Sequence, residues 1–325
     1  MQKTSRQNEN NRAVITFATD SNYVYYTGVT VFTMLQHISA DHKYHIVIMS
    51  SCLKKSEAEI FETLTAPYKN VSWEYIDMTQ WITQIGEQNF YTGRYAIANY
   101  YRLFLCDVLK NEDKIIYLDS DIIVQDDIFK LWEIDMQNYT IAAALDKNAL
   151  RLPVSVEVVF LKKLCKRLKI KKAHNYLNSG VLVMDLKKLR DMNFLDIVKR
   201  EVMTGIKFEL VDQDILNRVF ENNYLRLDKA WNHQPLQAGE EYQNDHILHI
   251  SGLRPWESVN KPYANIWWQT VEKTPFKELL QKKAAETRIK YLEQLEFRYF
   301  EICDTVCWKI TAPLRILSAL LKKFD

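Results

Sequence analysis

Two carboxylates stand two positions apart at the end of an apolar run. The run KIIYL (114–118) predicts a short buried strand, and Asp119 and Asp121 follow it directly. Because side chains alternate along an extended chain, both carboxylates face the same side. Acid-x-acid pairs also arise by chance in a chain with 41 acidic residues, so the position after a buried strand carries the argument. Paired oxygen ligands at a strand end suit a divalent cation that also grips a diphosphate.

A histidine ends another candidate strand, in the segment HISGLRPW (249–256). A lone histidine near an apolar run is usually structural, but here Gly252 allows close approach of the backbone and Arg254 supplies a cation for a phosphate. If the imidazole of His249 joins the two carboxylates, Mn²⁺ is favoured over Mg²⁺, because nitrogen ligands suit the softer ion. Mg²⁺ remains the alternative metal.

Two further junctions are polar where a buried element would prefer apolar residues. The segment NSG (178–180) precedes the apolar run VLVMD, and the segment DQD (212–214) opens a predicted helix, ILNRVF. An acid is favoured near a helix N-terminus in any case, so Asp212 has a capping interpretation as well as a functional one. Capping does not call for Gln213, which makes this amide the stronger functional candidate.

These residues need a scaffold, and the apolar runs along the chain predict one. Strands are expected at 13–18, 44–49, 71–76, 114–118, 141–145, 181–184 and 247–250, with helices at 24–38, 55–64 and 94–109. The alternation of strands and helices is typical of an α/β domain with a mostly parallel sheet. In such sheets ligands bind beyond the carboxyl ends of the strands, which is where the polar junctions fall.

Composition excludes several classes of protein. The 325 residues carry a formal net charge of only +2, so charge does not call for nucleic acid as a partner. The seven glycines are never closer than seven positions, which excludes the G-x-G-x-x-G fingerprint, the phosphate loop and the nucleophile elbow. Five cysteines without a C-x-x-C pair argue against a zinc ribbon or a disulfide framework. The polar N-terminus, expected to be disordered over 1–12, lacks a signal-peptide core, so we expect a cytoplasmic protein.

The chain changes character after residue 275. Apolar residues recur at spacings of three and four from Leu292 to Ile310, Pro313 interrupts the pattern, and a second apolar repeat with basic neighbours follows to Phe324. We expect an amphipathic helical tail over 276–325, which either packs on the main domain or lies on an anionic membrane surface as a peripheral anchor. A basic run without acids at 162–172 is ordinarily a solvated helix face, but it could also attract an anionic, lipid-linked glycan.

Seven segments in order resemble glycosyltransferase family 8, whose members include bacterial lipooligosaccharide galactosyltransferases and glycogenin. The resemblance runs from Ala13 to Trp256. Its segments are ATDSNY (18–23), YR (101–102), YLDSDIIV (117–124), LWEID (131–135) with Asp146 following, LNSGVLVMDL (177–186), DQDILN (212–217) and HISGLRPW (249–256). The late family motif usually reads H-x-x-G-x-x-K-P-W, whereas this chain is one residue shorter there and carries Arg254 in place of lysine.

The resemblance implies a single GT-A-type nucleotide-diphospho-sugar transferase domain over 13–275, and it carries roles over residue by residue. Mn²⁺ binding is implied for Asp119, Asp121 and His249. Nucleotide binding is implied for Ala18, Asp20, Asn22, Tyr23, Ser120, Gly252 and Arg254. Contact with the donor sugar is implied for Arg102, Asp146, Asn178 and Ser179. Catalytic positions facing the sugar are implied for Asp212 and Gln213.

The activity implied is transfer of a hexose, galactose or glucose, from a UDP-sugar to a glycan such as lipopolysaccharide, with retention of configuration. Gln213 is an amide and a poor nucleophile, which favours same-face attack over a covalent intermediate. One alternative is a nucleotidyltransferase, although those enzymes commonly carry a glycine-rich loop after the first strand and TDSNYVYY has none. The other alternative is an inactive relative that binds a UDP-sugar or glycan without turnover.

Overall fold

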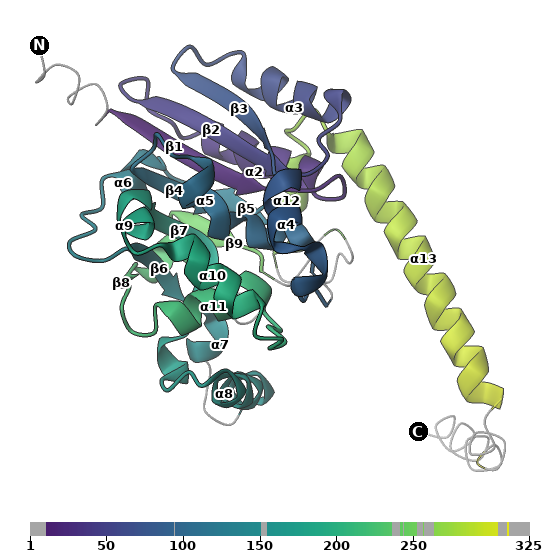
Figure 1. The fold of residues 1–325 in the computed structure, drawn as a ribbon. Helices are drawn as coiled ribbons and strands as arrows, with labels where there is room; N and C mark the ends of the chain where they lie inside the picture. Colours follow the sequence, from purple (N-terminus) through teal and green to yellow (C-terminus); the bar gives the residue numbers. More distant parts are fainter. Residues whose placement is uncertain are drawn as a thin grey trace, which may run out of the picture.

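The computed structural model describes residues 11–93, 95–150, 155–235, 241–242, 244–251, 256, 263–304 and 311. A seven-stranded sheet in the order β3-β2-β1-β4-β7-β6-β8 forms its centre (Figure 1). The strands are β1 (Arg12–Ala18), β2 (Lys43–Ser50), β3 (Val71–Asp77), β4 (Lys114–Leu118), β6 (Ile141–Leu145), β7 (Leu177–Asp185) and β8 (Leu225–Arg226).

One strand of this sheet runs against the others. β3, β2, β1 and β4 are parallel neighbours, and so are β6 and β8, whereas β7 is antiparallel to both β4 and β6. The expected α/β domain of GT-A type with a mostly parallel sheet is therefore confirmed, with β7 reversed. As a result the N-terminal end of β7 meets the carboxyl end of β4.

Both faces of the sheet are covered, which explains why the central strands read as continuous apolar runs. On one face lie α2 (Val24–Leu35), α3 (Lys55–Thr65) and α12 (Ala264–Val271). On the other lie α4 (Thr79–Ile85), α5 (Leu105–Val108), α8 (Val156–Leu168), α9 (Leu186–Asp191), α10 (Phe194–Val202) and α11 (Val211–Val219). Short connecting elements are η1 (Glu87–Asn89), α6 (Phe129–Trp132), α7 (Lys147–Leu150), η3 (Ala173–Asn175) and η4 (Lys229–Asn232).

Two local predictions were wrong. The helix expected at 94–109 is a 3₁₀ helix, η2 (Ile97–Phe104), followed by the single turn of α5, because side chains around its whole circumference are buried and tertiary contacts set its geometry. The NSG segment lies inside β7 rather than before it. The strand expected at 247–250 is present as β9 (Ile247–His249), and it pairs with β5 (Ile122–Val124) in a separate two-stranded sheet.

The long helix α13 (Lys277–Asp304) starts on the domain and then leaves it (Figure 1). Phe276, Leu280 and Ala284 are buried in the core that α2 and α3 share. From Ile289 to Tyr299 the large apolar side chains are exposed. Pro313 and the second apolar repeat lie outside the described residues. Among the described helices, none is long and apolar enough to cross a membrane.

Candidate active site

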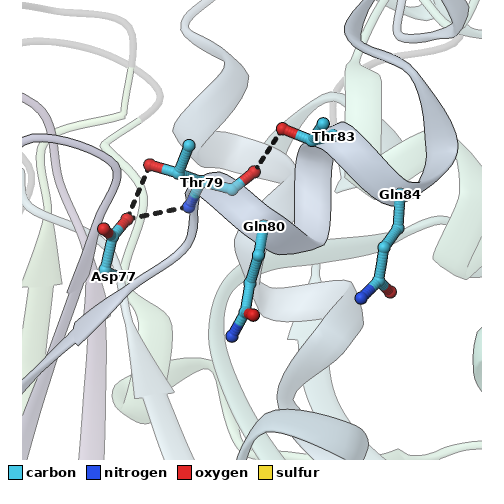
Figure 2. Close-up of a pocket in the computed structure, with 5 residues that line it drawn as sticks. All are labelled: Asp77, Thr79, Gln80, Thr83 and Gln84. Atoms are coloured by element: carbon cyan, nitrogen blue, oxygen red, sulfur yellow. Dashed lines mark hydrogen bonds between the residues drawn. The ribbon is translucent and has the colours of Figure 1, made fainter.

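Two cavities in the described part of the chain are candidates for a functional site. The smaller, of about 520 Å³, lies beside α4 and is lined by Asp77, Thr79, Gln80, Thr83 and Gln84 (Figure 2). The Asp77 carboxylate already accepts from the backbone N–H of Thr79 at 2.8 Å and from its hydroxyl at 2.6 Å, and these hydrogen bonds lower the pKa of Asp77. With one satisfied acid and four neutral residues, this cavity offers no set of metal ligands and no acid–base pair.

The larger cavity, of about 740 Å³, lies where the carboxyl ends of β1 and β4 meet the N-terminal end of β7. Its lining contains fourteen of the sixteen residues that the sequence assigns to a site: Ala18, Asp20, Asn22, Tyr23, Arg102, Asp119, Ser120, Asp121, Asp146, Asn178, Ser179, Asp212, Gln213 and His249. The other two, Gly252 and Arg254, lie outside the described residues. The separate polar junctions thus form one cleft.

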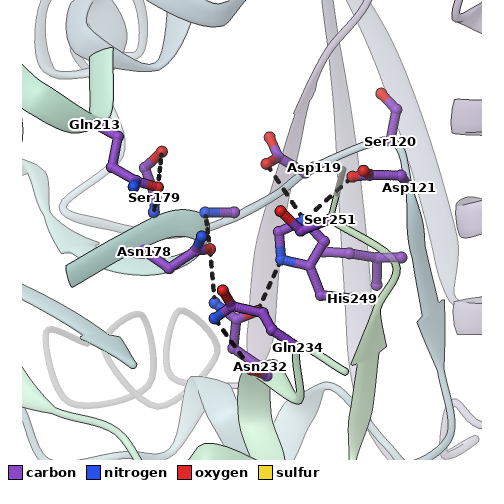
Figure 3. A network of polar contacts seen from close by, with 12 residues as sticks. Asp119, Ser120, Asp121, Asn178, Ser179, Gln213, Asn232, Gln234, His249 and Ser251 are labelled. Atoms are coloured by element: carbon purple, nitrogen blue, oxygen red, sulfur yellow. Dashed lines mark hydrogen bonds and ion pairs between the residues drawn. The ribbon is translucent and has the colours of Figure 1, made fainter. Parts of the chain in front are cut away.

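Three potential metal ligands converge on one point of this cleft (Figure 3). The β5–β9 ladder pairs Ile122 with His249, and the N–H of Ile250 donates to the carbonyl of Asp121 at 2.9 Å. His249 Nε2 consequently lies 3.2 Å from Asp121 Oδ1 and 3.8 Å from Asp119 Oδ2. One ligand atom from each of the three residues falls within 4.8 Å of the others.

A chain of side-chain amides fixes which nitrogen of His249 carries the proton. The N–H of Gly180 donates to Asn178 Oδ1 at 2.9 Å, and Asn232 Nδ2 donates to the same oxygen at 3.0 Å. The oxygen of Asn232 must then face His249 Nδ1, 2.8 Å away, and accept a hydrogen bond from its N–H. Nε2 is therefore the nitrogen that faces the two carboxylates. One imidazole nitrogen and two carboxylates, with the other nitrogen held by an amide oxygen, form a donor set that fits a divalent metal.

We predict that Asn232 positions the metal ligand. Asn232→Leu removes the acceptor for Nδ1–H and should weaken Mn²⁺ binding roughly tenfold to a hundredfold, as loss of partners of ligands does elsewhere. Asn232→Asp keeps an acceptor at this position and should retain most of the affinity. Free Mn²⁺ measured by electron paramagnetic resonance in the presence of UDP checks both variants, and equal losses in the two would refute the role.

Arg102 is the electrostatic centre of the cleft. Its guanidinium is 1% exposed and lies 2.8 Å from Asp119 Oδ1 and 3.0 Å from Asp212 Oδ2. It also donates to the carbonyl of Ser179 at 2.6 Å and lies over the ring of Tyr117, 4.1 Å from its centre. Burial alone would lower the pKa of Arg102, but the two carboxylates outweigh burial and raise it. The cation therefore ties a candidate metal ligand to the candidate catalytic segment.

Another part of the cleft is built around an amide, Gln213, and two acids, Asp146 and Asp212. Gln213 Nε2 donates to Asp146 Oδ2 at 3.1 Å, and Gln213 Oε1 accepts from the N–H of Ser179 at 3.0 Å. Asp212 Oδ2 receives no hydrogen bond from the described residues, since the Nε–H of Arg102 is directed at a backbone carbonyl. Burial raises the pKa of Asp212 to about 7, although Arg102 lowers it. Asp212 Oδ2 is therefore buried beside the charge of Arg102 and lacks a well-directed hydrogen-bond donor among the described residues.

The start of helix α2 forms one wall of the cleft. Asp20 Oδ1 accepts from the N–H groups of Asn22 at 2.8 Å and Tyr23 at 3.0 Å and so fixes the start of the helix. Within the helix, Thr27 Oγ1 lies 2.8 Å from Ser120 Oγ, and Thr30 Oγ1 donates to the carbonyl of Ser120 at 3.0 Å. Sequence reasoning missed these threonines. Their spacing of three positions in an otherwise apolar helix could have indicated a polar contact on one helix face. They hold the segment between the two metal-ligand carboxylates.

Asp214 faces away from the cleft. It is fully buried, accepts from the hydroxyl of Tyr176, and accepts from the N–H of Leu210 at 3.0 Å. Burial raises the pKa of Asp214 to about 6, despite these two hydrogen bonds, which lower it. Asp212 and Gln213 of the DQD segment line the cleft, whereas Asp214 belongs to the core.

A pH dependence of stability follows from Asp214. Its folded pKa lies above the usual Asp value of about 3.9, so its stabilising contribution is present below pH 4 and is lost as the pH rises through about 6. The loss amounts to about 3 kcal/mol. Asp214→Asn can still bond Tyr176 and Leu210, and it should remove this part of the pH dependence. Urea unfolding at pH 4.5 and 7.5 measures the difference, and parallel pH profiles for the two proteins would contradict the assignment.

The fold places the chain among GT-A-type glycosyltransferase structures. The WbbM bifunctional glycosyltransferase aligns with a TM-score of 0.69 at 20% identity, over 84% of this chain and 51% of WbbM. The galactosyltransferase LgtC, solved in complex with donor and acceptor sugar analogues, aligns with a TM-score of 0.63 at 19% identity, over 81% of this chain and 96% of LgtC.

The sequence defines the family. The profile of glycosyl transferase family 8 matches residues 14–260, and the chain belongs to this family. General stress protein A of Bacillus subtilis is 24% identical over 277 residues, which cover 78% of this chain and 91% of that protein. The probable galacturonosyltransferase-like 4 of Arabidopsis thaliana is 27% identical over 275 residues, covering 78% of this chain and 73% of the relative. The resemblance stated from the sequence motifs is thereby confirmed.

Proposed function

We propose that this protein transfers a hexose, galactose or glucose, from a UDP-sugar to a glycan acceptor with retention of the anomeric configuration. The single observation that carries the proposal is the convergence of Asp119, Asp121 and His249 on one point of the cleft that Asp212 also lines. The candidate cation site and the polar residues that could bind a sugar then lie in one cleft. Transfer of a sugar from a nucleotide diphosphate requires this arrangement, because the diphosphate and the sugar are joined.

The three ligands suit Mn²⁺ better than Mg²⁺, because one of them is an imidazole. The metal, when bound to Asp119, Asp121 and His249, would supply positive charge for the diphosphate of the departing UDP. Arg102 holds Asp119 in place from the protein side. The segment that contains Ala18, Asp20 and Asn22 would receive the uridine along the edge of β1.

On the sugar side, Asp212, which lines the cleft and is held by Arg102, would accept a hydroxyl of the donor sugar. Asp146 and Ser179 bond both ends of the Gln213 amide and hold it against the cleft. An amide is a poor nucleophile, so the acceptor hydroxyl would attack on the same face that UDP leaves, through an oxocarbenium-like state. The pocket would stabilise charge rather than form a covalent intermediate.

A UDP-release assay with Mn²⁺ tests the proposal. The donors are UDP-galactose, UDP-glucose, their N-acetylated analogues and UDP-galacturonate, the last suggested by the name of the Arabidopsis relative. We expect slow hydrolysis of one hexose donor, its loss with EDTA and its recovery with added Mn²⁺. Measurable UDP binding without release from any donor, even with glycan acceptors present, would instead support an inactive binding relative.

The acceptor belongs to the same proposal. We propose a lipid-linked cell-surface glycan, such as a lipopolysaccharide core, glycosylated at the cytoplasmic face of a membrane to which the protein is bound peripherally. The basic run at 162–172 supports this part, since its lysines are exposed on α8 and in the segment that follows this helix. The tail over 276–325 is the second candidate for membrane contact.

A further inference from the structure

The helix α8 presents an apolar patch to solvent. It buries Leu161, Leu164 and Leu168 against the core. On its outer side Val156 is 81% exposed, Val159 41% and Phe160 42%. With 3.6 residues per turn, these three side chains share one face over the first two turns of the helix. Exposed apolar residues scattered singly need no explanation, whereas three on one face indicate a contact surface.

The same face becomes basic over the next two turns. Lys162, Lys163 and Lys166 are exposed and make no ion pair with the described residues, while Arg167 pairs with Glu209 at 2.6 Å. The run continues through Lys169, Lys171 and Lys172, with Glu157 as the one acid between 155 and 172. We call the exposed part of this helix, Val156, Val159, Phe160, Lys162, Lys163 and Lys166, the α8 face.

The exposed helix α13 differs in charge. It also presents large apolar side chains to solvent, but its 28 residues carry six basic and six acidic side chains. A neutral helix gains nothing from an anionic surface. Between the two exposed helices, the α8 face is the one that combines apolar residues with uncompensated positive charge.

We infer that the α8 face docks the protein on an anionic lipid bilayer. The apolar residues would enter the boundary between headgroups and acyl chains, and the lysines would contact the lipid phosphates. A soluble polyanion or a nucleic acid would satisfy the lysines but would leave Val156, Val159 and Phe160 in water. A bilayer offers acyl chains to the apolar residues of the α8 face and phosphates to its lysines.

The position of α8 relates this contact to the active cleft. Asp146, Lys147 and Asn148 line the cleft, and the short helix α7 that begins at Lys147 contacts α8. Docking through the α8 face would therefore hold one wall of the cleft close to the membrane surface, where a lipid-linked acceptor is found. This step rests on the proposed function, since it assumes a lipid-linked acceptor.

The test is vesicle flotation of the full chain at 0.1 M salt, with phosphatidylcholine vesicles that contain or lack phosphatidylglycerol. Each lysine near an anionic surface contributes about 1 kcal/mol, so Lys163→Gln with Lys166→Gln should lower the partition coefficient roughly thirtyfold. Val159→Ser with Phe160→Ser should also lower binding severalfold. A matched control, Lys69→Gln with Lys110→Gln, removes two exposed lysines elsewhere and should bind as the wild type does.

Two outcomes would overturn the inference. Equal losses of vesicle binding in the Lys163/Lys166 variant and the Lys69/Lys110 control would mean that the total positive charge, and not the α8 face, determines binding. Unchanged binding in the Val159/Phe160 variant would exclude insertion into the bilayer. Hydrolysis of the UDP-sugar without vesicles should be the same in all variants. If the wild type binds vesicles but shows no UDP release, the proposed function fails while the docking surface stands.

Discussion

Replacing Arg102 with methionine should lower the free energy of unfolding by about 3–5 kcal/mol at pH 8, the usual cost of removing one partner from a buried ionic cluster. Arg102 is 1% exposed and neutralises both Asp119 and Asp212. Methionine fills much of the same volume but leaves Asp212, which is 2% exposed, without a compensating charge. Release of UDP should be lost as well, because Asp119 would no longer be held.

The loss of stability should depend on pH in a definite direction. Burial raises the pKa of Asp212 to about 7 even with Arg102 present, and without this cation the pKa should rise further. A carboxyl whose folded pKa lies above its unfolded value of about 3.9 destabilises the fold increasingly as the pH rises between the two values. Arg102→Met should therefore cost less at pH 5.5, where Asp212 is protonated, than at pH 8.

A matched control separates this effect from the general cost of losing an ion pair. Arg12 pairs with Glu112 at 3.0 Å with its side chain 36% exposed, and Arg12→Met should cost less than about 1 kcal/mol, as exposed pairs do. Guanidinium unfolding of both variants at the two pH values gives the comparison. A similar small loss in both, independent of pH, would show that Arg102 does not compensate a buried charge.

The elements of the fold that depend on local patterns were predictable. Apolar runs bounded by polar residues mark β1 and β4, since both are buried on two faces. Asp119 and Asp121 come directly after the carboxyl end of β4. In a mostly parallel sheet, ligands are expected to bind beyond the carboxyl ends of the strands. These features need only the periodicity of the chain and the burial of its strands.

Features that depend on partners distant in sequence were not predictable. The reversal of β7 decides that Gly180 meets Asp119, yet an apolar run reads the same in either direction. Asn232 follows an unremarkable segment, and its role arises only because the β5–β9 ladder carries His249 next to it. Val211, held at a φ of 45°, turns the chain before Asp212, a strained conformation for a branched residue that no pattern announces.

Gly180 is the clearest example of such a dependence, and it leads to the second prediction. Its backbone carbonyl accepts from the N–H of Asp119 at 2.8 Å, so the two residues are direct neighbours across β7 and β4. A Cβ atom at this position would lie 2.2 Å from Cε1 of His249 and 2.8 Å from Oδ2 of Asp119. Glycine is required here for space beside two metal ligands.

Gly180→Ala should consequently inactivate the metal site as fully as Asp119→Asn, which removes a ligand outright. Loss of a residue that merely supports a ligand weakens metal binding roughly tenfold to a hundredfold, so displacement of His249 itself should exceed about a hundredfold. Mn²⁺ affinity and Mn²⁺-dependent UDP release measure the effect. Gly205→Ala is the control for a general loss of stability, because a Cβ there meets nothing within 4 Å and lies outside the cleft lining, while the φ of +71° strains alanine.

The two variants should nevertheless differ in one respect, which makes the comparison informative. Asp119→Asn keeps the shape of the cleft and a hydrogen-bonding partner for Arg102, so UDP without metal should bind it as weakly as it binds the wild type. In Gly180→Ala the methyl group must displace the His249 ring, and the amide chain through Asn232 to Asn178 and Asp146 has to shift with it. The donor sugar should then bind more weakly even at saturating Mn²⁺, whereas a Gly180→Ala protein with wild-type KM for the donor would show that the metal side and the sugar side of the cleft are not coupled.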